Sequence, residues 1–238
     1  MSDRPVGPPV KEWQTPPRPG PERIEGRYAL LERLSPEHAA PLFSSFSGHD
    51  WVWDYMPVGP FASPETFQEW LSAAASRDDP MFYAIRDGDS GAWTGFASFL
   101  RIDPAAGSIE VGFIAMSPAL QRTRAATEAI YLMMQWAFDA GYRRFEWKCD
   151  ALNAPSRRAA RRFGFVFEGV FRQATIVKGR NRDTAWFAVI DRDWPLLRTA
   201  YEIWFDPGNF DAGGEQIQSL SDLTAPIVAS GEAEAAGL

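Results

Sequence analysis

The spacing of apolar residues changes along the middle of the chain, and this change restricts the fold more than any other feature. Up to Met116 the apolar residues alternate with polar ones in short runs, which is typical of half-buried strands. From Ala126 to Phe138 they recur every three or four residues, as in an amphipathic helix, and Gly141 ends this pattern. Alternation then returns over Arg143–Asp150. This order of periods predicts a mixed α+β sheet.

The strands expected before this helix form an antiparallel meander, because the turns between them are too short for a crossover. These three strands are 81–86, 93–101 and 108–116. Ser35 and Ser63, each followed by Pro-Glu, are the N-caps of two earlier helices. The other expected elements are a first strand at 27–33, a helix at 153–163, a hairpin of strands 165–177 and 184–190, and a last helix at 195–204.

The two ends of the chain differ in composition from the middle. Residues 1–26 hold seven prolines, which exclude helix interiors and central strands, so we expect an extended arm. Val10 and Trp13 are the apolar residues through which this arm would lie on the domain. The tail is rich in Gly, Ala and Glu and is expected to fray after about Thr224. The predicted organisation is an arm (1–26), one domain (27–205) and a partly disordered tail (206–238).

Composition excludes several classes of protein. The single cysteine, Cys149, rules out an intramolecular disulfide and a cysteine-based zinc cluster, and two histidines are too few for a histidine-rich metal site. No apolar run reaches the roughly 18 residues that a membrane span needs, and the N-terminus lacks a signal-peptide core. We therefore expect a cytoplasmic protein with no metal and no membrane partner.

The formal net charge is −7, and the charges are unevenly distributed. Residues 119–162 hold nine Lys or Arg and four Asp or Glu, whereas the remainder is acidic. A short cationic segment in an acidic protein argues against nucleic-acid binding, which needs a broad basic face. It suits one compact anionic ligand, and the acidic remainder would attract a cation.

The segment from Ser117 to Ala129 joins an apolar strand to the start of the amphipathic helix. Unpaired main-chain N–H groups and the helix dipole make such a junction suitable for an anion. Arg122 and Arg124 add two donors there. On charge alone, a surface loop with two solvated arginines explains the same residues.

This segment, followed by Asn153-Ala154-Pro155-Ser156 and by Phe163-Gly164-Phe165, resembles the GNAT superfamily of acyl-CoA-dependent N-acetyltransferases, and within it the RimJ/RimL-like branch. Gln121 and Ala126 match the ends of the family's pyrophosphate loop. The resemblance covers about Gly26 to Trp194. It implies an α/β/α layered fold, with a mostly antiparallel twisted sheet, a splay between two central parallel strands and helices on both faces.

The resemblance also implies where acetyl-CoA, the co-substrate, would bind. Its pantetheine would pair with the main chain around Phe113, Ile114 and Met116. Its pyrophosphate would lie on the loop, and Asn153 and Ser156 occupy positions that often contact the cofactor in the family. The loop residues concerned are Gln121, Arg122, Thr123, Arg124, Ala125 and Ala126.

The chain departs from the family pattern at two positions. The central glycine of the loop is Arg124 here, whose guanidinium would either bind a phosphate or crowd the site. The tyrosine that protonates the departing thiolate in many relatives is Ala160 here. Ser156, or a water that it holds, is the remaining candidate for that role.

Glu110 is the preferred general base, because it is the only acidic residue in 108–114 and the family often uses a strand carboxylate there. Alternation places Ile109, Val111 and Phe113 on one face and Glu110 on the other. A solvent-facing carboxylate on a half-buried strand is the simpler alternative. Asp150, at the end of the neighbouring strand, would serve as base instead or bind the acceptor.

The aromatic segment with Trp51, Trp53 and Tyr55 would border the acceptor pocket in the resembled family, and its rings would hold an amine by cation–π contact. Burial in the core explains these residues equally well. The acceptor is expected to be a protein N-terminus or a small cationic amine. The sequence leaves the oligomeric state open, and a homodimer is one state that it allows.

Two other classes of function compete with an enzyme that acetylates a primary amine. The first is a non-catalytic CoA-binding or scaffold module, for which Arg124 and the missing tyrosine would mark lost turnover. The second is a ribosome- or RNA-associated protein, against which the net negative charge speaks.

Overall fold

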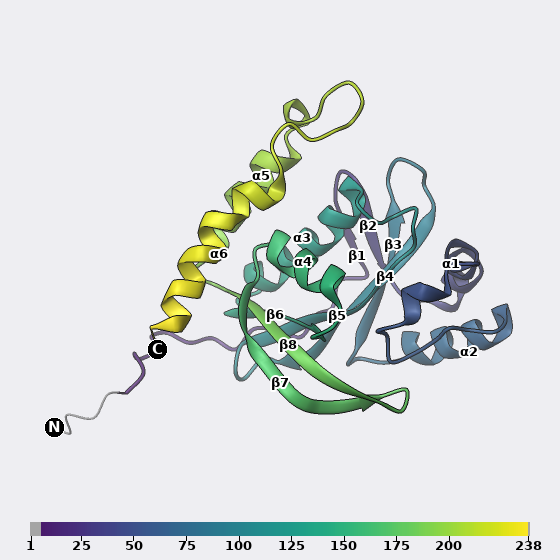
Figure 1. Cartoon of the computed structure of the whole chain (residues 1–238), viewed down its shortest axis with the longest axis horizontal. Helices are drawn as coiled ribbons and strands as arrows, with labels where there is room; N and C mark the ends of the chain where they lie inside the picture. Colours follow the sequence, from purple (N-terminus) through teal and green to yellow (C-terminus); the bar gives the residue numbers. More distant parts are fainter. Residues whose placement is uncertain (1–5, 238) are drawn as a thin grey trace.

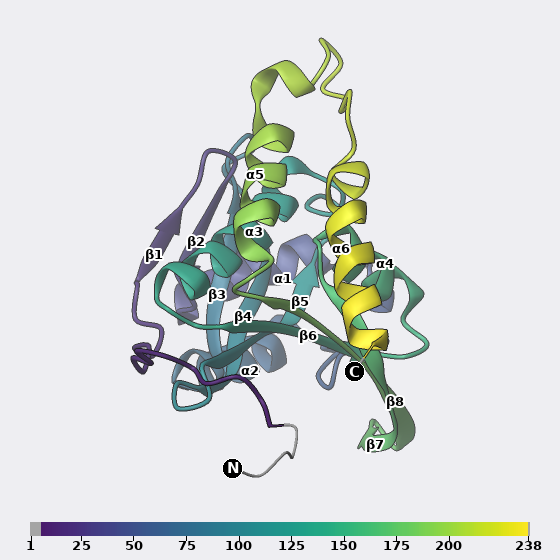
Figure 2. The same ribbon diagram turned by 90° about the vertical axis from the view of Figure 1, so that its left-hand side faces the viewer.

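The computed structural model describes residues 6–237, and these form one eight-stranded sheet with helices on both faces (Figures 1 and 2). The strand order is β1-β2-β3-β4-β5-β6-β8-β7. The neighbouring strands are antiparallel except β5 and β6, which are parallel. This arrangement confirms the predicted mixed, mostly antiparallel α+β sheet.

Apart from β1 and α6, which were not expected, the elements follow the order that the apolar periods predict. The strands are β1 (Arg23–Glu25), β2 (Ala29–Arg33), β3 (Met81–Asp87), β4 (Trp93–Asp103), β5 (Ser108–Met116), β6 (Arg144–Asp150), β7 (Val166–Val177) and β8 (Arg180–Ile190). The helices are α1 (Ala39–Phe46), α2 (Pro64–Ala75), α3 (Arg124–Asp139), α4 (Ala154–Arg162), α5 (Trp194–Phe205) and α6 (Leu220–Ala236). Three short 3-10 turns are η1 (Pro36–His38), η2 (Asp50–Trp53) and η3 (Pro207–Asn209).

Two clusters of buried side chains cover the two faces of the sheet. The first joins α3, α4 and α5 to the face that carries Phe145, Trp147 and Cys149, as the alternation of β6 predicts. The second joins α1 and α2 to the other face, around Phe82 and Phe96. The second cluster covers the part of its face formed by β3, β4 and the end of β5. Charged side chains occupy the part of that face where β5 and β6 are paired.

The carboxylate of Glu128 ties α3 to the sheet. It is buried and accepts hydrogen bonds from the main-chain N–H groups of Arg27 (3.0 Å), Tyr28 (2.5 Å) and Ala29 (2.7 Å). Arg27 and Tyr28 precede β2, and Ala29 is its first residue. One side chain of α3 therefore accepts the hydrogen bonds of three N–H groups about 100 residues earlier in the chain. Satisfying buried donors in this way stabilises the fold, because an unpaired buried N–H is costly.

We expect Glu128→Ala to lower the free energy of unfolding by about 3 kcal/mol, since buried N–H groups lose their acceptor. Urea denaturation measures the loss. Glu202→Ala is the matched control, because Glu202 forms only an exposed i,i+4 pair with Arg198 and its removal should cost less than about 0.5 kcal/mol. Equal losses in the two variants would contradict this account of Glu128.

The proline-rich segment lies against the domain as an extended arm, of which residues 1–5 are outside the described residues. Its buried residues are Pro16 and Pro19. Trp13 lies beside Gly107 but is 38% exposed, and Val10 is exposed as well. Pro17 and Pro21 accept hydrogen bonds from Tyr142 Oη (3.0 Å) and Tyr83 Oη (2.9 Å). The sheet begins within this segment, because residues 23–25 form β1 on the edge beside β2. The domain therefore starts earlier than the predicted boundary at residue 27.

The C-terminal segment does not fray after Thr224 as predicted, but forms α6, with residue 238 outside the described residues. Ser219 caps the helix, and Leu220, Thr224 and Val228 are buried. Thr224 Oγ1 donates to the main-chain oxygen of Arg162 at 3.1 Å, and Arg161 pairs with Glu232 at 2.7 Å. The composition suggested disorder because Gly and Ala are abundant, but small residues also allow a helix to pack closely on α4.

Candidate active site

The parallel strands β5 and β6 separate halfway along their length. Within residues 6–237 they are paired from Ser108 opposite Arg144 to Val111 opposite Trp147. Beyond this point β5 stays paired to β4 as far as Met116, and β6 stays paired to β8 as far as Asp150. The facing edges of the two strands therefore carry main-chain groups with no strand partner, and the predicted splay is confirmed.

A β-bulge at Phe113 changes which face of the sheet the side chains of β5 point to within the splay. Phe113 has a φ of 47°, in the left-handed region, and the pairing of β4 with β5 shifts at this place. Its ring lies 5.2 Å from that of Phe82 and belongs to the second core. The prediction that Phe113 shares a face with Ile109 and Val111 is therefore wrong, because the irregularity shifts the alternation by one residue.

The loop after β5 presents main-chain donors at the start of α3. Thr123 is the N-cap, and its Oγ1 accepts from the N–H of Ala126 at 3.0 Å. Gln121 Nε2 donates to the main-chain oxygen of Met116 at 2.9 Å and so ties the loop to β5. Among the described residues, the N–H groups of Arg122, Arg124 and Ala125 have no acceptor. Together with the helix dipole, these donors fit a diphosphate.

The left-handed residue of this loop is Arg122, with a φ of 65°, whereas Arg124 begins the helix. The guanidinium of Arg124 stands over the rings of Tyr28 (4.7 Å) and Phe210 (5.0 Å) and lies 3.6 Å from Asp89. This side chain therefore contacts the residue before β2, the residue after η3 and the turn after β3. The predicted contact of its guanidinium with a phosphate would require these contacts to break, so the part of Arg124 available to the loop is its main-chain N–H.

The start of α4 lies beside the far strand of the splay. Asn153 is the N-cap, with its Oδ1 accepting from the N–H of Ser156 at 3.1 Å. Ser156 Oγ accepts from the indole N–H of Trp147 at 3.0 Å, which places it on the helix side of β6. Asp150 is held by the N–H of Leu152 at 2.8 Å. Ala160 is fully buried in the first core.

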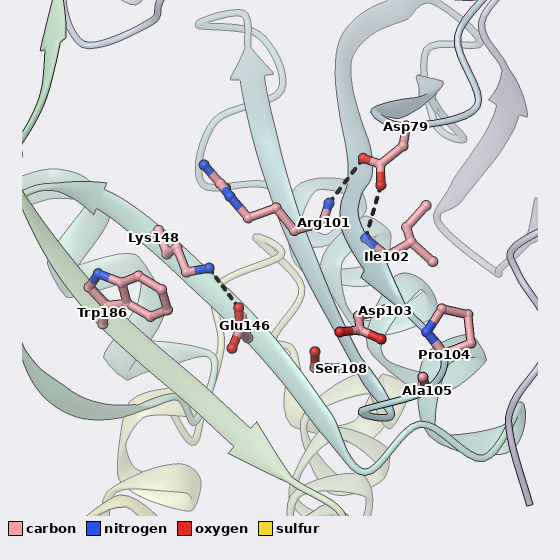
Figure 3. Close-up of a pocket in the computed structure, with 10 residues that line it drawn as sticks. All are labelled: Asp79, Arg101, Ile102, Asp103, Pro104, Ala105, Ser108, Glu146, Lys148 and Trp186. Carbon is pink, nitrogen blue, oxygen red and sulfur yellow. Dashed lines mark hydrogen bonds and ion pairs between the residues drawn. The ribbon is translucent and has the colours of Figure 1, made fainter.

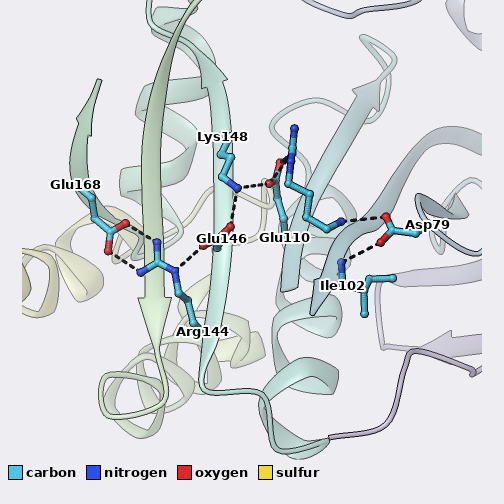
Figure 4. A network of polar contacts seen from close by, with 8 residues as sticks. Asp79, Ile102, Glu110, Arg144, Glu146, Lys148 and Glu168 are labelled. Atoms are coloured by element: carbon cyan, nitrogen blue, oxygen red, sulfur yellow. Dashed lines mark hydrogen bonds and ion pairs between the residues drawn. The ribbon is translucent and has the colours of Figure 1, made fainter. Parts of the chain in front are cut away.

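Glu110 lies on the other side of the sheet, inside a network of charged groups (Figure 4). Its side chain is only 3% exposed, and it pairs with Lys148 Nζ at 2.8 Å and with Arg101 Nη1 at 2.7 Å. Lys148 also pairs with Glu146 at 2.7 Å, and Arg144 joins Glu146 to Glu168. Glu110 is therefore not the solvent-facing carboxylate that a half-buried strand would carry.

The two carboxylates of this network differ in their affinity for protons. Burial raises the pKa of Glu110 above its ordinary value, although Lys148 and Arg101 act in the opposite direction. Burial also acts to raise the pKa of Glu146, but hydrogen bonds from Arg144 and Lys148 outweigh it and hold that pKa below the ordinary value. Glu110 is thus the stronger base of the pair.

A cavity of about 550 Å³ opens beside this network (Figure 3). Its walls include Asp79, Arg101, Asp103, Glu146, Lys148 and Trp186. Lys148 Nζ stands 3.7 Å from the centre of the Trp186 ring, so this cation has an aromatic and two carboxylate neighbours. The cavity lies on the face opposite α3 and α4, because Glu146 and Lys148 alternate with the buried Phe145 and Trp147.

The aromatic segment divides between core and surface. Trp53 is buried among Phe46, Phe61 and other rings of the second core, as the alternative of burial in the core predicts for it. Trp51 and Tyr55 are 53% and 40% exposed. Tyr55 Oη donates to the main-chain oxygen of Leu152 at 3.3 Å, which places it just beyond the end of β6.

The turn between β7 and β8 contacts the aromatic segment that contains Trp51, Trp53 and Tyr55. Lys178 Nζ donates to the main-chain oxygen of Trp53 at 2.8 Å. Lys178 and Gly179 both have positive φ, as a tight two-residue hairpin turn requires. The exposed Trp51 and Tyr55 thus belong to a segment that contacts both the end of β6 and the hairpin.

Three residues of this site, Arg101, Lys148 and Trp186, were not predicted from the sequence. Alternation along β6 places Lys148 on the face of Glu146, but only the register of β5 against β6 brings it to Glu110. Arg101 is itself the left-handed residue at the kink of β4, a conformation that no local pattern indicates. Among the described residues no helix is long and apolar enough to cross a membrane, and no three His, Cys, Asp or Glu residues are grouped to hold a metal ion.

Comparison with known proteins places this geometry in a family. The family described as "Acetyltransferase (GNAT) domain" matches residues 29–166. A comparison with curated proteins found no significant match. The departures at Arg124 and Ala160 thus occur within a domain whose family and fold are otherwise matched.

Three solved structures are similar to the chain. A GCN5-related N-acetyltransferase from Brucella melitensis is 46% identical, with a TM-score of 0.89, over 91% of this chain and 100% of that one. A probable GNAT-family acetyltransferase from Chromobacterium violaceum is 41% identical, with a TM-score of 0.76, over 82% and 99%. An acetyl transferase from Salmonella typhimurium that modifies the N-terminal serine of ribosomal protein L7/L12 is 22% identical, with a TM-score of 0.62, over 71% and 99%, and shows the fold alone.

The splayed parallel strands and the donor-rich loop before α3 therefore occur in a chain whose family uses acetyl-CoA as co-substrate. The chain belongs to the GNAT family of acetyltransferases.

Proposed function

We propose that the protein transfers the acetyl group of acetyl-CoA to a primary amine that enters on the Glu110 face of the splay. The observation that carries this proposal is the buried Glu110 carboxylate on β5, next to the place where β5 and β6 separate, with a cavity on the same side. Acetyl-CoA supplies the activated acyl group when bound. The chain would hold its pantetheine along 113–116 and its diphosphate on the N–H groups of Arg122, Arg124 and Ala125.

In this proposal Glu110 accepts the proton that the amine loses as its nitrogen bonds to the acetyl carbon. The carbon–sulfur bond breaks, and the sulfur leaves as a thiolate that Ser156, or a water on it, protonates. Ser156 lies on the opposite side of the sheet from Glu110, so the two proton transfers would occur on the two sides of the splay. A main-chain N–H of the bulge at Phe113 would stabilise the charge on the carbonyl oxygen.

The acceptor class follows from the charges around the cavity. The carboxylates of Asp79, Asp103 and Glu146 and the cations of Arg101 and Lys148 line it. Because Glu110 lies beside these groups, carboxylates outnumber cations around the cavity, which favours an ammonium over an anionic group. A protein N-terminus, as in the RimJ/RimL-like branch, and a small cationic amine both satisfy this requirement. Asp150, at the end of β6, would contact the acceptor where it enters.

A panel of acceptors tests the proposal. Thiol release from acetyl-CoA is measured with peptides of free N-terminus, polyamines, amino acids and aminoglycosides, and mass spectrometry locates the added acetyl group. We expect release that depends on one of these classes, with acetylation on a primary amine. Absence of acceptor-dependent release across the panel, in a protein that acetyl-CoA stabilises against heat, would refute the proposed function.

Trp51 is expected to contribute to binding of a cationic acceptor. We expect Trp51→Leu to raise the KM for the acceptor by about two- to thirtyfold, because a cation–π contact is worth about 0.5–2 kcal/mol, and to leave the KM for acetyl-CoA unchanged. Trp51→Phe keeps an aromatic ring that binds cations less tightly, so its KM for the acceptor should lie between those of the wild type and Trp51→Leu. Equal KM values for Trp51→Leu and Trp51→Phe would show that the ring does not bind the cation.

A further inference from the structure

The N-terminal arm contacts the wall of the cavity through Arg18. Its Nη1 donates to the main-chain oxygen of Ile102 at 3.3 Å, and its Nη2 donates to that of Asp78 at 3.2 Å. Nη2 also lies 3.8 Å from Asp79 Oδ2. Arg18 is outside the matched family domain, which begins at residue 29. The arm therefore adds a cation to this domain. Arg18 contacts two residues of the cavity wall, Ile102 and Asp79, without lining the cavity itself.

Asp79 holds the main chain of β4 at an irregular place (Figures 3 and 4). Its Oδ1 accepts from the N–H of Arg101 and its Oδ2 from that of Ile102, each at 3.0 Å. Arg101 has a φ of 46°, and the pairing of β4 with β5 shifts between Leu100 and Asp103. A left-handed arginine is uncommon and persists only where its surroundings hold it, which the two bonds from Asp79 do.

From this kink the guanidinium of Arg101 reaches the proposed base. Its Nη1 donates to both carboxylate oxygens of Glu110, at 2.8 and 2.7 Å. The Arg101 side chain is 60% exposed, so packing does not restrict its rotamers. The direction in which the Arg101 side chain leaves β4 is therefore determined by the main-chain conformation at Arg101. Asp79 and Arg18 fix that conformation through their hydrogen bonds to the main chain of residues 101 and 102.

We propose that Asp79 and Arg18 are positioning residues for acetyl transfer: they fix the left-handed main chain at Arg101, from which its guanidinium holds the Glu110 carboxylate. The proposal rests on the proposed role of Glu110 as the base. Through these contacts the arm, about 90 residues earlier in the chain, acts on the acceptor side of the reaction.

The expected consequence is a change in pH dependence. The charged groups that face Glu110 are Arg101 from β4 and Lys148 from β6, and Lys148 is shared with Glu146. When Arg101 moves away, Glu110 loses one of its two cations and retains its proton to higher pH. Since a base works deprotonated, the acidic limb of the kcat profile moves to higher pH.

The experiment records kcat and KM against pH for Asp79→Asn, Arg18→Ala and Arg18→Lys, with an acceptor that the wild type uses. In Asp79→Asn and Arg18→Ala we expect kcat on the acidic limb to fall about three- to tenfold and the alkaline plateau to change by less than about twofold. Arg18→Lys should recover part of the wild-type profile. Lys11→Ala removes an exposed cation of the same arm and should match the wild type.

Arg101→Ala provides a second measurement that does not depend on how Asp79→Asn folds, since the exposed side chain is removed directly. It should show the same upward movement of the limb. An unchanged limb in Arg101→Ala, or in Arg18→Ala with wild-type thermal stability, overturns the proposal. An acidic limb that persists in Glu110→Gln refutes the proposed base instead, so the two failures are distinct.

Discussion

Glu110→Gln is expected to lower kcat by about 10²- to 10⁴-fold, the contribution typical of a general base. Glutamine has nearly the same shape and can still accept a hydrogen bond from Lys148 or Arg101, so the change removes the basic oxygen and retains the packing. The KM for acetyl-CoA should change little, because the expected cofactor contacts lie on 113–116 and on the loop before α3. Steady-state kinetics at saturating acetyl-CoA measures the effect.

The pH profile of this variant is the more diagnostic result. Burial raises the pKa of Glu110, so in the wild type the rate falls as the pH drops through that raised value and the carboxylate becomes protonated. The acidic limb due to this group should disappear in Glu110→Gln. Glu168→Gln is the matched control, because Glu168 ends the same network through Arg144 and does not contact Glu110. Wild-type rates at every pH in Glu110→Gln would exclude this base.

Thr123→Asp is expected to weaken binding of acetyl-CoA without unfolding the protein. Aspartate is as good an N-cap as threonine or better, so the cap on the N–H of Ala126 should survive. Its charge would lie beside the N–H groups of Arg122, Arg124 and Ala125, where a diphosphate is expected. Repulsion of about 1–4 kcal/mol at 4 Å corresponds to roughly five- to several-hundredfold weaker binding.

Thermal denaturation with and without acetyl-CoA measures both parts of this prediction. The melting temperature of Thr123→Asp without ligand should fall only slightly, because the hydrogen bond that Thr123 Oγ1 donates to the main-chain oxygen of Leu120 is lost, at a cost of about 1 kcal/mol. The rise caused by acetyl-CoA should shrink. Thr123→Ser keeps a neutral cap and should respond to acetyl-CoA as the wild type does. An undiminished rise in Thr123→Asp would show that the diphosphate does not lie on this loop.

Much of the fold and part of the site could be predicted from local patterns. The alternation of Phe145, Trp147 and Cys149 identified the buried face of β6, and Asn153 with Pro155 identified the start of α4. Thr123 to Ala126 lie at a helix start as expected. These predictions succeed because strand alternation, N-caps and helix periods are properties of neighbouring residues.

Other parts depended on contacts between distant residues. Trp53 and the tail after Thr224 have compositions that fit both a surface role and a buried one, and packing against α2 and α4 decided between them. The face of Phe113 was wrongly predicted because a left-handed residue interrupts the alternation. A non-glycine residue carries no local signal for that conformation, since its neighbours impose it.

The amino-acid sequence by itself determined the order of strands and helices from β2 to α5, the donor-rich start of α3 and the presence of one carboxylate on β5. Those features follow from the period of the apolar residues and from caps that act within one turn. Only the tertiary structure decided that Glu110 is buried between Arg101 and Lys148, and that Asp79 and Arg18 stand behind Arg101. The reason is physical: the register of β5 against β6 and the kink of β4 are set by pairing and packing across the whole sheet, and these bring together charges that are far apart along the chain.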